Sequence, residues 1–553
     1  MTVTISRNFP VNPHVSSLID GASVPLRATG EDIAVVNPTT EEQISQLREA
    51  DADEVDAAVR SARRAFDSGR WPRMDITERK DILYSIRDHL RKNAEELAYL
   101  ECLNTGLPLH SVRVHVQRMA RNFEFFAEVA STVHGETYTQ TAGYLTYVTR
   151  EPKGVAGCIA PWNAPLALAS MRVATCIPWG NTCVLKPSEY TPLSMRRMVE
   201  IFHEAGLPPG VVNLVNGRGA VTGNALVAHP GIDMVGFTGG TVTGRAIAAA
   251  AGRNLKPVAL ELGGKSANII FDTADVERAL DGALAGIFGN NGQQCLAGSR
   301  ILVQRGIADA LIERFVQRAR KIRLGDPMLP STEIGPLAFR QHMERVLSYV
   351  EVAKADGATL LTGGRRSEQH EKGWFIEPTA VLAPHNDSRV CQEEIFGPFA
   401  TFLVFDTLDE AIHIANSSNF GLVTYVWSED LSTVMRCSRE IRVARAFRRL
   451  QRIRHWSRRP TGEPRVLHRA QGHHHPDRPR EDAPLRGFLT ARRRRPGKRL
   501  EIPTLPPLMF WMKFTSTPFG SRKVISLDTT PCAASSSKVG GQRISSPNLT
   551  APR

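Results

Sequence analysis

The chain has 553 residues, of which 42% are hydrophobic, so it is long enough for about three to four domains of ~150 residues and is not wholly disordered. Its net charge of +13 would by itself suggest an anionic partner, but the charge is uneven along the chain. Residues 441–553 hold 25 Lys and Arg against 6 Asp and Glu, a net charge of +19, which leaves −6 for residues 1–440. A slightly acidic globular protein therefore precedes a basic tail of different composition.

The sequence carries no visible address for membrane or export. It has no uninterrupted apolar run of ~18 residues, which excludes a typical membrane-spanning helix. Residues 1–20 lack the basic start and apolar core of a secretory signal. The eight cysteines are scattered without a CxxC pair, a pattern typical of reduced thiols. These features predict a cytoplasmic protein.

The first part of the chain is predicted to be mainly helical. Residues 53–68 carry apolar side chains at close to helical spacing, and residues 76–100 repeat the pattern. Around residues 138–148 the sequence YTQTAGYLTYV alternates and is rich in Thr and Tyr. That alternation favours a hairpin-like excursion between two larger parts.

From residue 154 onward, short apolar runs of β character alternate with stretches compatible with helices. The predicted strands include GVAGCIA, TCVLK, VVNLV and MVGFT, and the helices that follow them cover residues 165–177, 192–205, 220–228 and 242–251. This alternation predicts a parallel sheet with helices on both faces. A second α/β set is predicted from about residue 266 to 438.

Three residues have side chains suited to covalent catalysis at a carbonyl carbon. Cys295 lies in FGNNGQQCLAGSR, a loop of glycines and amides where a thiol can gain thiolate character. Glu261 ends an apolar strand in ALELGGKS, where partial burial suits a general base, and Asn163 in APWNAPL offers an amide donor to an oxyanion. Taken singly, each has a plainer interpretation: a buried structural cysteine, a salt bridge at a strand end and an Asx turn.

Three other segments carry residues that could bind the ribose, phosphate and nicotinamide groups of a dinucleotide. Lys186 and Glu189 follow a strand in VLKPSEYTP, where Lys can meet a hydroxyl or phosphate and Glu can accept from ribose hydroxyls, although both residues are equally typical of a solvated surface. FTGGTVTG, residues 237–244, is a Gly-rich turn that exposes backbone N–H groups to a phosphate, but it is not GxGxxG. Glu394 and Phe396 in CQEEIFGP suit a nicotinamide ribose and ring, or simply form a turn before a strand.

Seven segments in this order resemble the aldehyde dehydrogenase superfamily of NAD(P)-dependent enzymes: PWNAPL, NTCVLKPSE, FTGGTVTG, LELGGKSANIIF, NGQQCLAGSR, GDPMLPSTEIGPL and EEIFGP. The resemblance covers roughly residues 19–441. It implies an α/β fold with a Rossmann-like NAD-binding domain formed by residues 1–135 and 150–261, a small bridging hairpin at 136–149, and a second α/β catalytic domain at 262–440.

The resemblance also implies roles for the three candidate catalytic residues. Cys295 corresponds to the nucleophile that forms a thiohemiacetal, and Asn163, together with the backbone N–H of Cys295, corresponds to the oxyanion hole. Once hydride has passed to the nicotinamide, Glu261 corresponds to the base that activates water against the thioester. The implied reaction converts an aldehyde into a carboxylic acid, and the implied assembly is a homodimer or homotetramer.

The implied cofactor is NAD, with NADP as the alternative. Lys186 and Glu189 correspond to positions that contact the adenosine ribose, and a Glu there fits NAD better because it would repel a 2′-phosphate. Glu394 and Phe396 correspond to the nicotinamide side. The complete set of implied cofactor contacts is Ala160, Pro161, Trp162, Lys186, Ser188, Glu189, Phe237, Thr238, Gly239, Gly240, Thr241, Gly244, Leu262, Glu394 and Phe396.

The sequence departs from the family at a few positions of the site. Gly240 stands where a Ser is common, so a hydroxyl contact to phosphate is missing. Ala164 and Met171 stand where larger aromatic residues are frequent, which suggests a roomier substrate pocket. The PWNAPL variant is similar to that of hydroxymuconic-semialdehyde dehydrogenases, which act on ring-cleavage products of aromatic degradation, so a semialdehyde is the predicted substrate.

Residues 441–553 lose both the resemblance and the periodicity and are predicted to be irregular or disordered. A one-base shift, with permissible codons, gives residues 483–498 a family-like sequence. We therefore hypothesise a reading-frame change near residues 441–446. An inactive or unstable product of a disrupted gene is accordingly an alternative to an active enzyme.

The basic tail also allows a nucleic-acid tether, since the arginines at residues 492–495 and the basic run before them would attract phosphates. Its few aromatic residues show no stacking pattern. The three adjacent histidines at 473–475 cannot all face one ion on a regular element, so no metal site is predicted.

Overall fold

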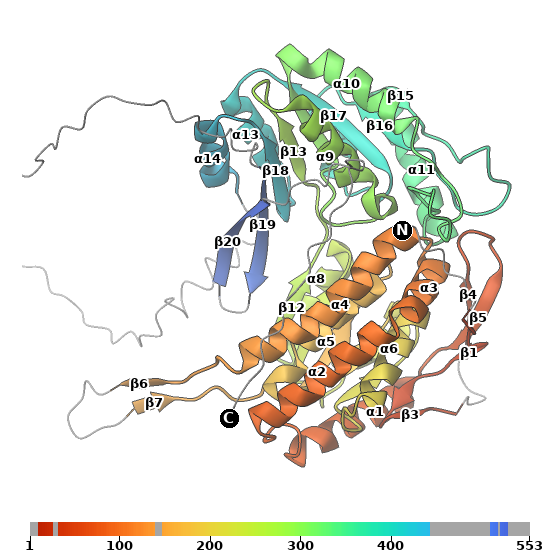
Figure 1. The fold of residues 1–553 in the computed structure, drawn as a ribbon, viewed down its shortest axis with the longest axis vertical. Coiled ribbons are helices and arrows are strands. Elements are labelled where there is room, and N and C mark those ends of the chain that lie inside the picture. The colour runs from red at the N-terminus through yellow and green to blue at the C-terminus, as the bar shows by residue number, and fades with distance from the viewer. Residues whose placement is uncertain (1–8, 26–30, 139–145, 443–508, 518–519, 529–553) are drawn as a thin grey trace, which may run out of the picture.

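Two large sheets covered by helices form the body of the protein, and a thin two-stranded arm extends from one of them (Figure 1). The computed structural model describes residues 9–25, 31–138, 146–442, 509–517 and 520–528. Among these residues, no helix is long and apolar enough to cross a membrane.

The first large sheet has seven strands, in the order β12-β11-β8-β9-β10-β2-β3. The first five are parallel to their neighbours, and β2 and β3 add antiparallel strands at one edge. Every residue of β8 and β9 is buried, which explains why the sequence shows them as continuous apolar runs. Their bounds are β2 Leu18–Ile19, β3 Ala22–Ser23, β8 Val155–Ile159, β9 Thr182–Lys186, β10 Val212–Leu214, β11 Met234–Thr238 and β12 Val258–Glu261.

Helices that precede and follow its strands in the chain cover this sheet, some in direct contact with the strands and others packed on that first layer. The run predicted at 76–100 is divided at Asn93, which ends one helix and precedes the next. The helices are α1 Ala52–Asp67, α2 Ile76–Lys92, α3 Ala94–Thr105, α4 Leu109–Ala130, α5 Pro165–Ala174, α6 Leu193–Glu204, α7 Asn224–Ala228 and α8 Thr241–Arg253, with short 3-10 and π turns at Ile177–Trp179 and Gly219–Gly223. The structure thus has the predicted strand–helix alternation.

The second large sheet has the strand order β15-β16-β17-β14-β13-β18-β19-β20. Its centre, from β16 to β18, is parallel. Its described strands are β13 Ala267–Ile270, β14 Arg300–Gln304, β15 Thr359–Thr362, β16 Thr379–Leu382, β17 Phe399–Phe405, β18 Val423–Trp427, β19 Met509–Thr517 and β20 Gly520–Asp528. Its helices are α9 Val276–Phe288, α10 Arg305–Ala319, α11 Arg340–Ala355, α12 Arg389–Gln392, α13 Leu408–Asn416 and α14 Leu431–Glu440, with a 3-10 turn at Gly289–Gly292.

Most of the basic tail lies outside the described residues, including residues 443–446 of the frame-change segment, the arginine run and the three histidines. The described part differs from an irregular chain, because β19 and β20 form an antiparallel hairpin. That hairpin extends the second sheet through antiparallel pairing of β19 with β18 (Figure 1). The edge of the sheet that β18 would otherwise leave open is therefore paired.

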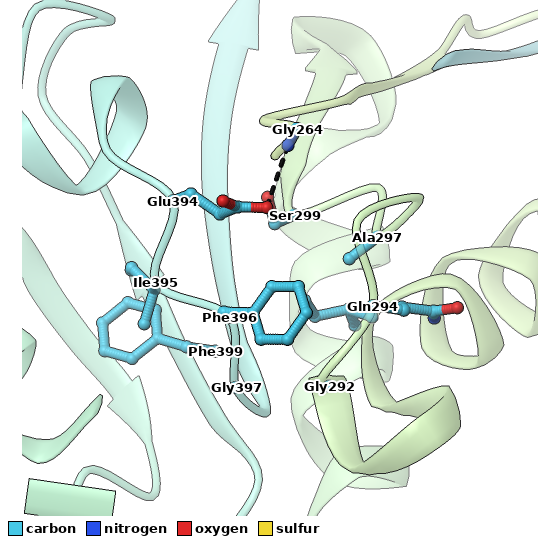
Figure 2. A pocket seen from close by; sticks show the side chains of 11 residues that line it. Gly264, Gly292, Gln294, Ala297, Ser299, Glu394, Ile395, Phe396, Gly397 and Phe399 are labelled. Atoms are coloured by element: carbon cyan, nitrogen blue, oxygen red, sulfur yellow. Dashed lines mark hydrogen bonds between the residues drawn. The ribbon is translucent and has the colours of Figure 1, made fainter. Parts of the chain in front are cut away.

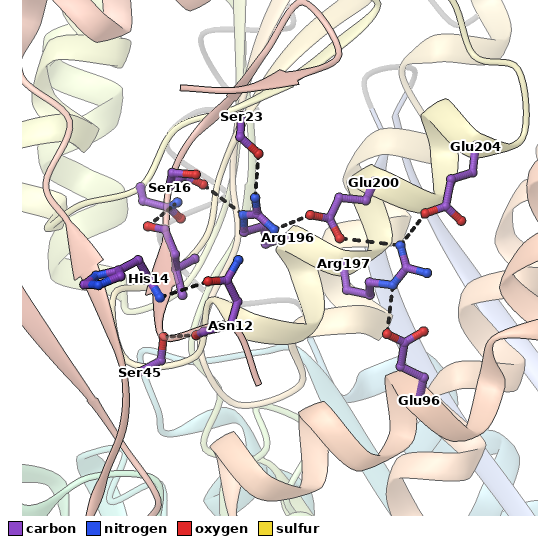
Figure 3. Close-up of polar contacts among 12 residues, drawn as sticks. Asn12, His14, Ser16, Ser23, Ser45, Glu96, Arg196, Arg197, Glu200 and Glu204 are labelled. Carbon is purple, nitrogen blue, oxygen red and sulfur yellow. Dashed lines mark hydrogen bonds and ion pairs between the residues drawn. The ribbon is translucent and has the colours of Figure 1, made fainter. Parts of the chain in front are cut away.

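Smaller elements frame the first sheet. Strands β1 His14–Val15, β5 Gln43–Arg48 and β4 Asp32–Val36 form one small sheet, and β6 Glu136–Tyr138 and β7 Thr146–Val148 form the arm. Two adjacent arginines of α6 connect the N-terminal segment to the helical layer (Figure 3). Arg196 donates to the Ser16 carbonyl at 3.1 Å, and Arg197 donates to Glu96 of α3 at 3.0 Å.

The strand order of the first sheet marks where a ligand would bind. The chain builds β8, β9 and β10 in one direction, then returns and places β11 on the other side of β8. In open parallel sheets, ligands bind beyond the carboxyl ends of the strands at such a switch point. The segments that begin at Ala160, after β8, and at Gly239, after β11, border this position.

Candidate active site

The buried amide of Asn163 connects the end of β8 to the cysteine loop of the other sheet. Its Nδ2 donates to the Gln293 carbonyl at 2.8 Å, two residues before Cys295. Asn290 Nδ2 in turn donates to the carbonyls of Asn163 and Gln293, at 2.8 and 3.0 Å. A side-chain amide has two N–H donors, so Asn163 keeps a second donor for another acceptor.

The loop that carries Cys295 has an unusual backbone that is fixed by its neighbours. Asn290 and Asn291 have φ values of +56° and +55°, in the left-handed region that Asn tolerates better than most residues. Asn291 Nδ2 donates to the carbonyls of Gly106 and Pro336, both at 2.9 Å. Cys295 itself is partly exposed. The loop thus presents the thiol from a backbone held by buried hydrogen bonds.

The segment between β12 and β13 passes directly against the cysteine loop. Glu261 is the last residue of β12 and is half-buried. Three residues later, a Cβ placed on Gly264 would lie 2.3 Å from the carbonyl oxygen of Cys295. Only glycine allows this approach, and it brings the Glu261 end of β12 and the Cys295 loop into one region.

Glu394 and Phe396 lie beside both the cysteine loop and the β12–β13 segment, where they line a small pocket with Gly264, Gln294, Ala297 and Ser299 (Figure 2). The Glu394 carboxylate accepts from the Gly264 N–H at 2.9 Å. Burial raises the pKa of Glu394 above its usual value. A Cβ on Gly292 would lie 2.2 Å from the backbone of Gly397, so the turn after Phe396 also contacts the cysteine loop.

The predicted adenosine side lies just past β9. Lys186 is buried at the end of that strand, with Nζ 3.5 Å from the Glu189 carboxylate. Burial lowers the pKa of Lys186, and Glu189 opposes that shift. Ser188 is buried between them in the chain, and its hydroxyl accepts from the Tyr190 N–H at 3.4 Å.

The Gly-rich turn joins Phe237 and Thr238, the last residues of β11, to the start of α8. A Cβ on Gly239 would lie 2.5 Å from the Phe237 ring, and one on Gly244 would lie 2.3 Å from the side chain of Leu262. A Cβ on Gly240 would meet no heavy atom within 4 Å, so the Ser common in the family would fit there.

The residues after β8 end in an aromatic cluster. Ala160 is buried and donates its N–H to the Lys186 carbonyl at 3.0 Å, and Pro161 and Trp162 follow it. The Trp162 ring centroid lies 5.4 Å from that of Phe396 and 4.9 Å from that of His342. The predicted positions at the ends of β8, β11 and β12 and in the Glu394 turn are therefore adjacent to the cysteine loop or to one another.

Several polar residues at the site were not predicted from the sequence. Arg172 of α5 donates to the Thr238 hydroxyl and to the Phe237 carbonyl, and its charge interacts favourably with Glu261. His342 and Arg345 of α11 bond the backbone around Phe396. The positions of His342 and Arg345 in the sequence give no signal of this role, because the contacts depend on how α11 packs.

Among the described residues, no group of three or more His, Cys, Asp or Glu side chains is arranged to hold a metal ion.

Comparison with known proteins gives the class to which this fold and site belong. The model of the aldehyde dehydrogenase family matches residues 26–448. The chain belongs to this family of oxidoreductases. It is 41% identical over 446 residues to 5-carboxymethyl-2-hydroxymuconate semialdehyde dehydrogenase of Escherichia coli, a match that covers 80% of this chain and 94% of that protein.

Solved structures confirm the α/β fold predicted from the sequence. Betaine aldehyde dehydrogenase from Staphylococcus aureus, solved in complex with NAD+, matches with a TM-score of 0.76 and 37% identity, over 78% of this chain and 86% of that one. HpcC from Thermus thermophilus matches with a TM-score of 0.75 and 41% identity, over 77% and 84% of the two chains.

Proposed function

We propose that this protein oxidises an aldehyde to a carboxylic acid by covalent catalysis at Cys295, with NAD as the hydride acceptor. The observation that supports this best is the 2.8 Å hydrogen bond from the buried Asn163 amide to the Gln293 carbonyl. It places an amide with one remaining donor beside the loop that carries the thiol. A nucleophile and an oxyanion donor held together in this way are what acyl chemistry at a carbonyl carbon requires.

In this proposal the Cys295 sulfur, as thiolate, attacks the aldehyde carbon, and the carbonyl oxygen takes up negative charge. Asn163 and the backbone N–H of Cys295 donate hydrogen bonds to that oxygen. Bound NAD would supply the acceptor for the hydride that this carbon loses, and a thioester would remain on Cys295. Glu261 then takes a proton from a water molecule as that water attacks the thioester, and release of the acid restores the thiolate.

The residues at the ends of β8, β9 and β11 fit NAD. The Thr241 hydroxyl, at the start of α8, is buried and has no hydrogen-bond partner among the described residues. A phosphate at this helix N-terminus would provide one. The Lys186–Glu189 pair would contact the adenosine ribose, and its carboxylate favours NAD over NADP. The segments containing Pro161, Ser188 and Leu262 would complete this side, and Glu394 and Phe396 would hold the nicotinamide end.

The substrate we propose is a semialdehyde from the breakdown of aromatic compounds. The similarity to 5-carboxymethyl-2-hydroxymuconate semialdehyde dehydrogenase supports this choice. Ala164, which follows Asn163 in the chain, and Met171 of α5 support it further, because they stand where large aromatic rings are frequent in the family and would leave more room.

The same proposal includes a cytoplasmic location, a homodimer or homotetramer, and two domains divided near residue 261, with β6 and β7 as the bridging hairpin. None of the seven cysteines in the described part of the chain is paired in a disulfide, which agrees with a reducing compartment. Size-exclusion chromatography would test the assembly. Only aggregated protein would favour the alternative of an unstable product of a disrupted gene.

The direct test of function is an assay of NADH formation with a panel of simple aldehydes and unsaturated semialdehydes, with Cys295→Ala as the comparison. The proposal predicts turnover with the native protein and none with the variant. Retained turnover in Cys295→Ala would contradict the nucleophile assignment. A reading-frame-restored chain, assayed in parallel, would show what the basic tail changes.

A further inference from the structure

Side chains on one face of α11 form hydrogen bonds with three consecutive backbone carbonyl groups, those of residues 394–396. His342 Nε2 lies 2.7 Å from the Phe396 carbonyl oxygen. Arg345, one turn later, donates to the carbonyls of Glu394 and Ile395 at 2.7 and 3.1 Å. Residues three apart on a helix share a face, so the two side chains act on the segment from one side.

The same face holds this segment at a further point. The Tyr349 hydroxyl, seven residues after His342, donates to the Glu393 carboxylate at 2.8 Å. The Arg345 guanidinium lies 5.5 Å from the centroid of the Tyr349 ring. Residues 393–396 are therefore bonded to α11 at every position, by two backbone-directed side chains and one side-chain pair.

The backbone that these contacts hold is one that a free chain avoids. Phe396 has φ = +66°, a left-handed conformation that is rare and strained for a bulky residue. Such a conformation persists only where the surroundings impose it. In this conformation the Phe396 ring contacts the Trp162 ring, and the Glu394 carboxylate accepts a hydrogen bond from the Gly264 N–H.

His342 is suited to act as a fixed donor at this point. A carbonyl oxygen only accepts, so Nε2 must carry the proton. The imidazole is buried against Trp162 and Phe339, and burial lowers the pKa of His342 to about 4. It therefore stays neutral at ordinary pH and keeps this single hydrogen bond.

We propose that His342 and Arg345 are positioning residues that hold the Glu394–Phe396 segment in the shape that receives the nicotinamide end of NAD, and so align the hydride acceptor with the carbon bound to Cys295. This inference rests on the proposed function. Neither residue touches the reacting atoms; each acts through the backbone that it bonds. Because Gly397 packs against Gly292 of the cysteine loop, movement of this segment would change the distance between the cofactor and the thiol.

The test compares four variants. His342→Leu removes the donor, and His342→Gln keeps an amide donor. Arg345→Met removes the second clamp at an exposed position and should not affect folding. Arg340→Met is the matched control, since Arg340 lies on the same helix but pairs with Glu41 instead.

Each variant is measured for its NAD dissociation constant by calorimetry, for KM and kcat, and for the deuterium isotope effect on kcat with an aldehyde labelled at the reacting carbon. A displacement near 1 Å costs up to about a hundredfold in rate. We therefore expect His342→Leu and Arg345→Met to weaken NAD binding about tenfold, to lower kcat/KM for NAD about ten- to a hundredfold, and to at least double the isotope effect. His342→Gln should remain within about threefold of the native protein, as should Arg340→Met.

The inference is overturned if His342→Leu and Arg345→Met keep the native NAD affinity and isotope effect. It is also overturned if their losses only follow a lower melting temperature and a changed rate of Cys295 alkylation, because those readouts mark a purely structural role. A native protein that binds NAD but oxidises no aldehyde would refute the proposed function alone, and the calorimetry would still decide the role of α11. A native protein that does not bind NAD would refute both.

Discussion

Gly264→Ala tests the link between the β12–β13 segment and the cysteine loop with a single methyl group. The new Cβ would lie 2.3 Å from the Cys295 carbonyl oxygen, whereas Cβ atoms in proteins essentially never come closer than 3.0 Å. The opposing atom is backbone, so the loop must shift by at least about 0.7 Å. Gly264 does not have a positive φ, so the alanine backbone is unstrained and the contact alone is changed.

A displacement near 1 Å at a reacting group costs up to about a hundredfold in rate. We therefore expect kcat/KM for the aldehyde to fall about ten- to a hundredfold, equivalent to about 1.4–2.7 kcal/mol of transition-state stabilisation. The assay is NADH formation at saturating NAD, with the melting temperature recorded for each variant.

Gly306→Ala is the matched control for this substitution, because a Cβ there meets no heavy atom within 4 Å. It should leave kcat/KM unchanged. If Gly264→Ala kept the native kcat/KM, the close approach of the two segments would not control the position of the thiol, and the reasoning would fail.

Four further outcomes are expected. Asn163→Ala should lower kcat about 10²–10³-fold, measured by NADH formation, because one oxyanion donor is lost; an unchanged kcat would remove Asn163 from the oxyanion hole. Glu261→Gln should slow thioester hydrolysis more than hydride transfer. Stopped-flow measurement should therefore still show a burst of NADH in this variant although steady-state turnover is lost, and loss of both would contradict the role of Glu261 as the base for hydrolysis. Glu189→Gln should raise kcat/KM for NADP about tenfold relative to NAD, since a charge that repels a 2′-phosphate is removed; an unchanged ratio would disprove that role. Because His342 has its pKa lowered from 6.5 to about 4 by burial, the unfolded state binds more protons between these values, and this contribution to stability is full above pH 6.5 and lost as the pH falls toward 4. Between pH 6.5 and pH 4, the free energy of unfolding measured with urea should therefore fall by up to about 3 kcal/mol less in His342→Leu than in the native protein. Equal decreases in the two proteins would contradict the lowered pKa of His342.

The sequence predicted the architecture where burial leaves a strong pattern. β8 and β9 are buried along their whole length, so their continuous apolar runs could be recognised as strands in the sequence. The strand–helix alternation after residue 154 was predicted from such runs. The break at Asn93 was not predicted, because the apolar spacing continues across it and only the cap residue marks the change. The β19–β20 hairpin was not predicted either, since its pairing with β18 depends on strands far apart in the chain.

The site was predicted to the extent that its residues stand in recognisable segments. The catalytic roles of Cys295, Glu261 and Asn163 stay predictions. The structure adds the contacts of the cysteine loop with the Asn163 amide and with the segment that follows Glu261. Consecutive asparagines followed by glycine at residues 290–292 were a usable signal of left-handed backbone before the thiol. By contrast, His342 and Arg345 lie about 50 residues from the segment they hold, and nothing in the spacing of α11 indicates that contact.

The most direct test of the central claim is mass spectrometry of the protein after acid quench during turnover with aldehyde and NAD. The account predicts an acyl group on the peptide that contains Cys295, more abundant in Glu261→Gln than in the native protein. An acyl group on another residue, or NADH formation with no covalent adduct in Glu261→Gln, would contradict it.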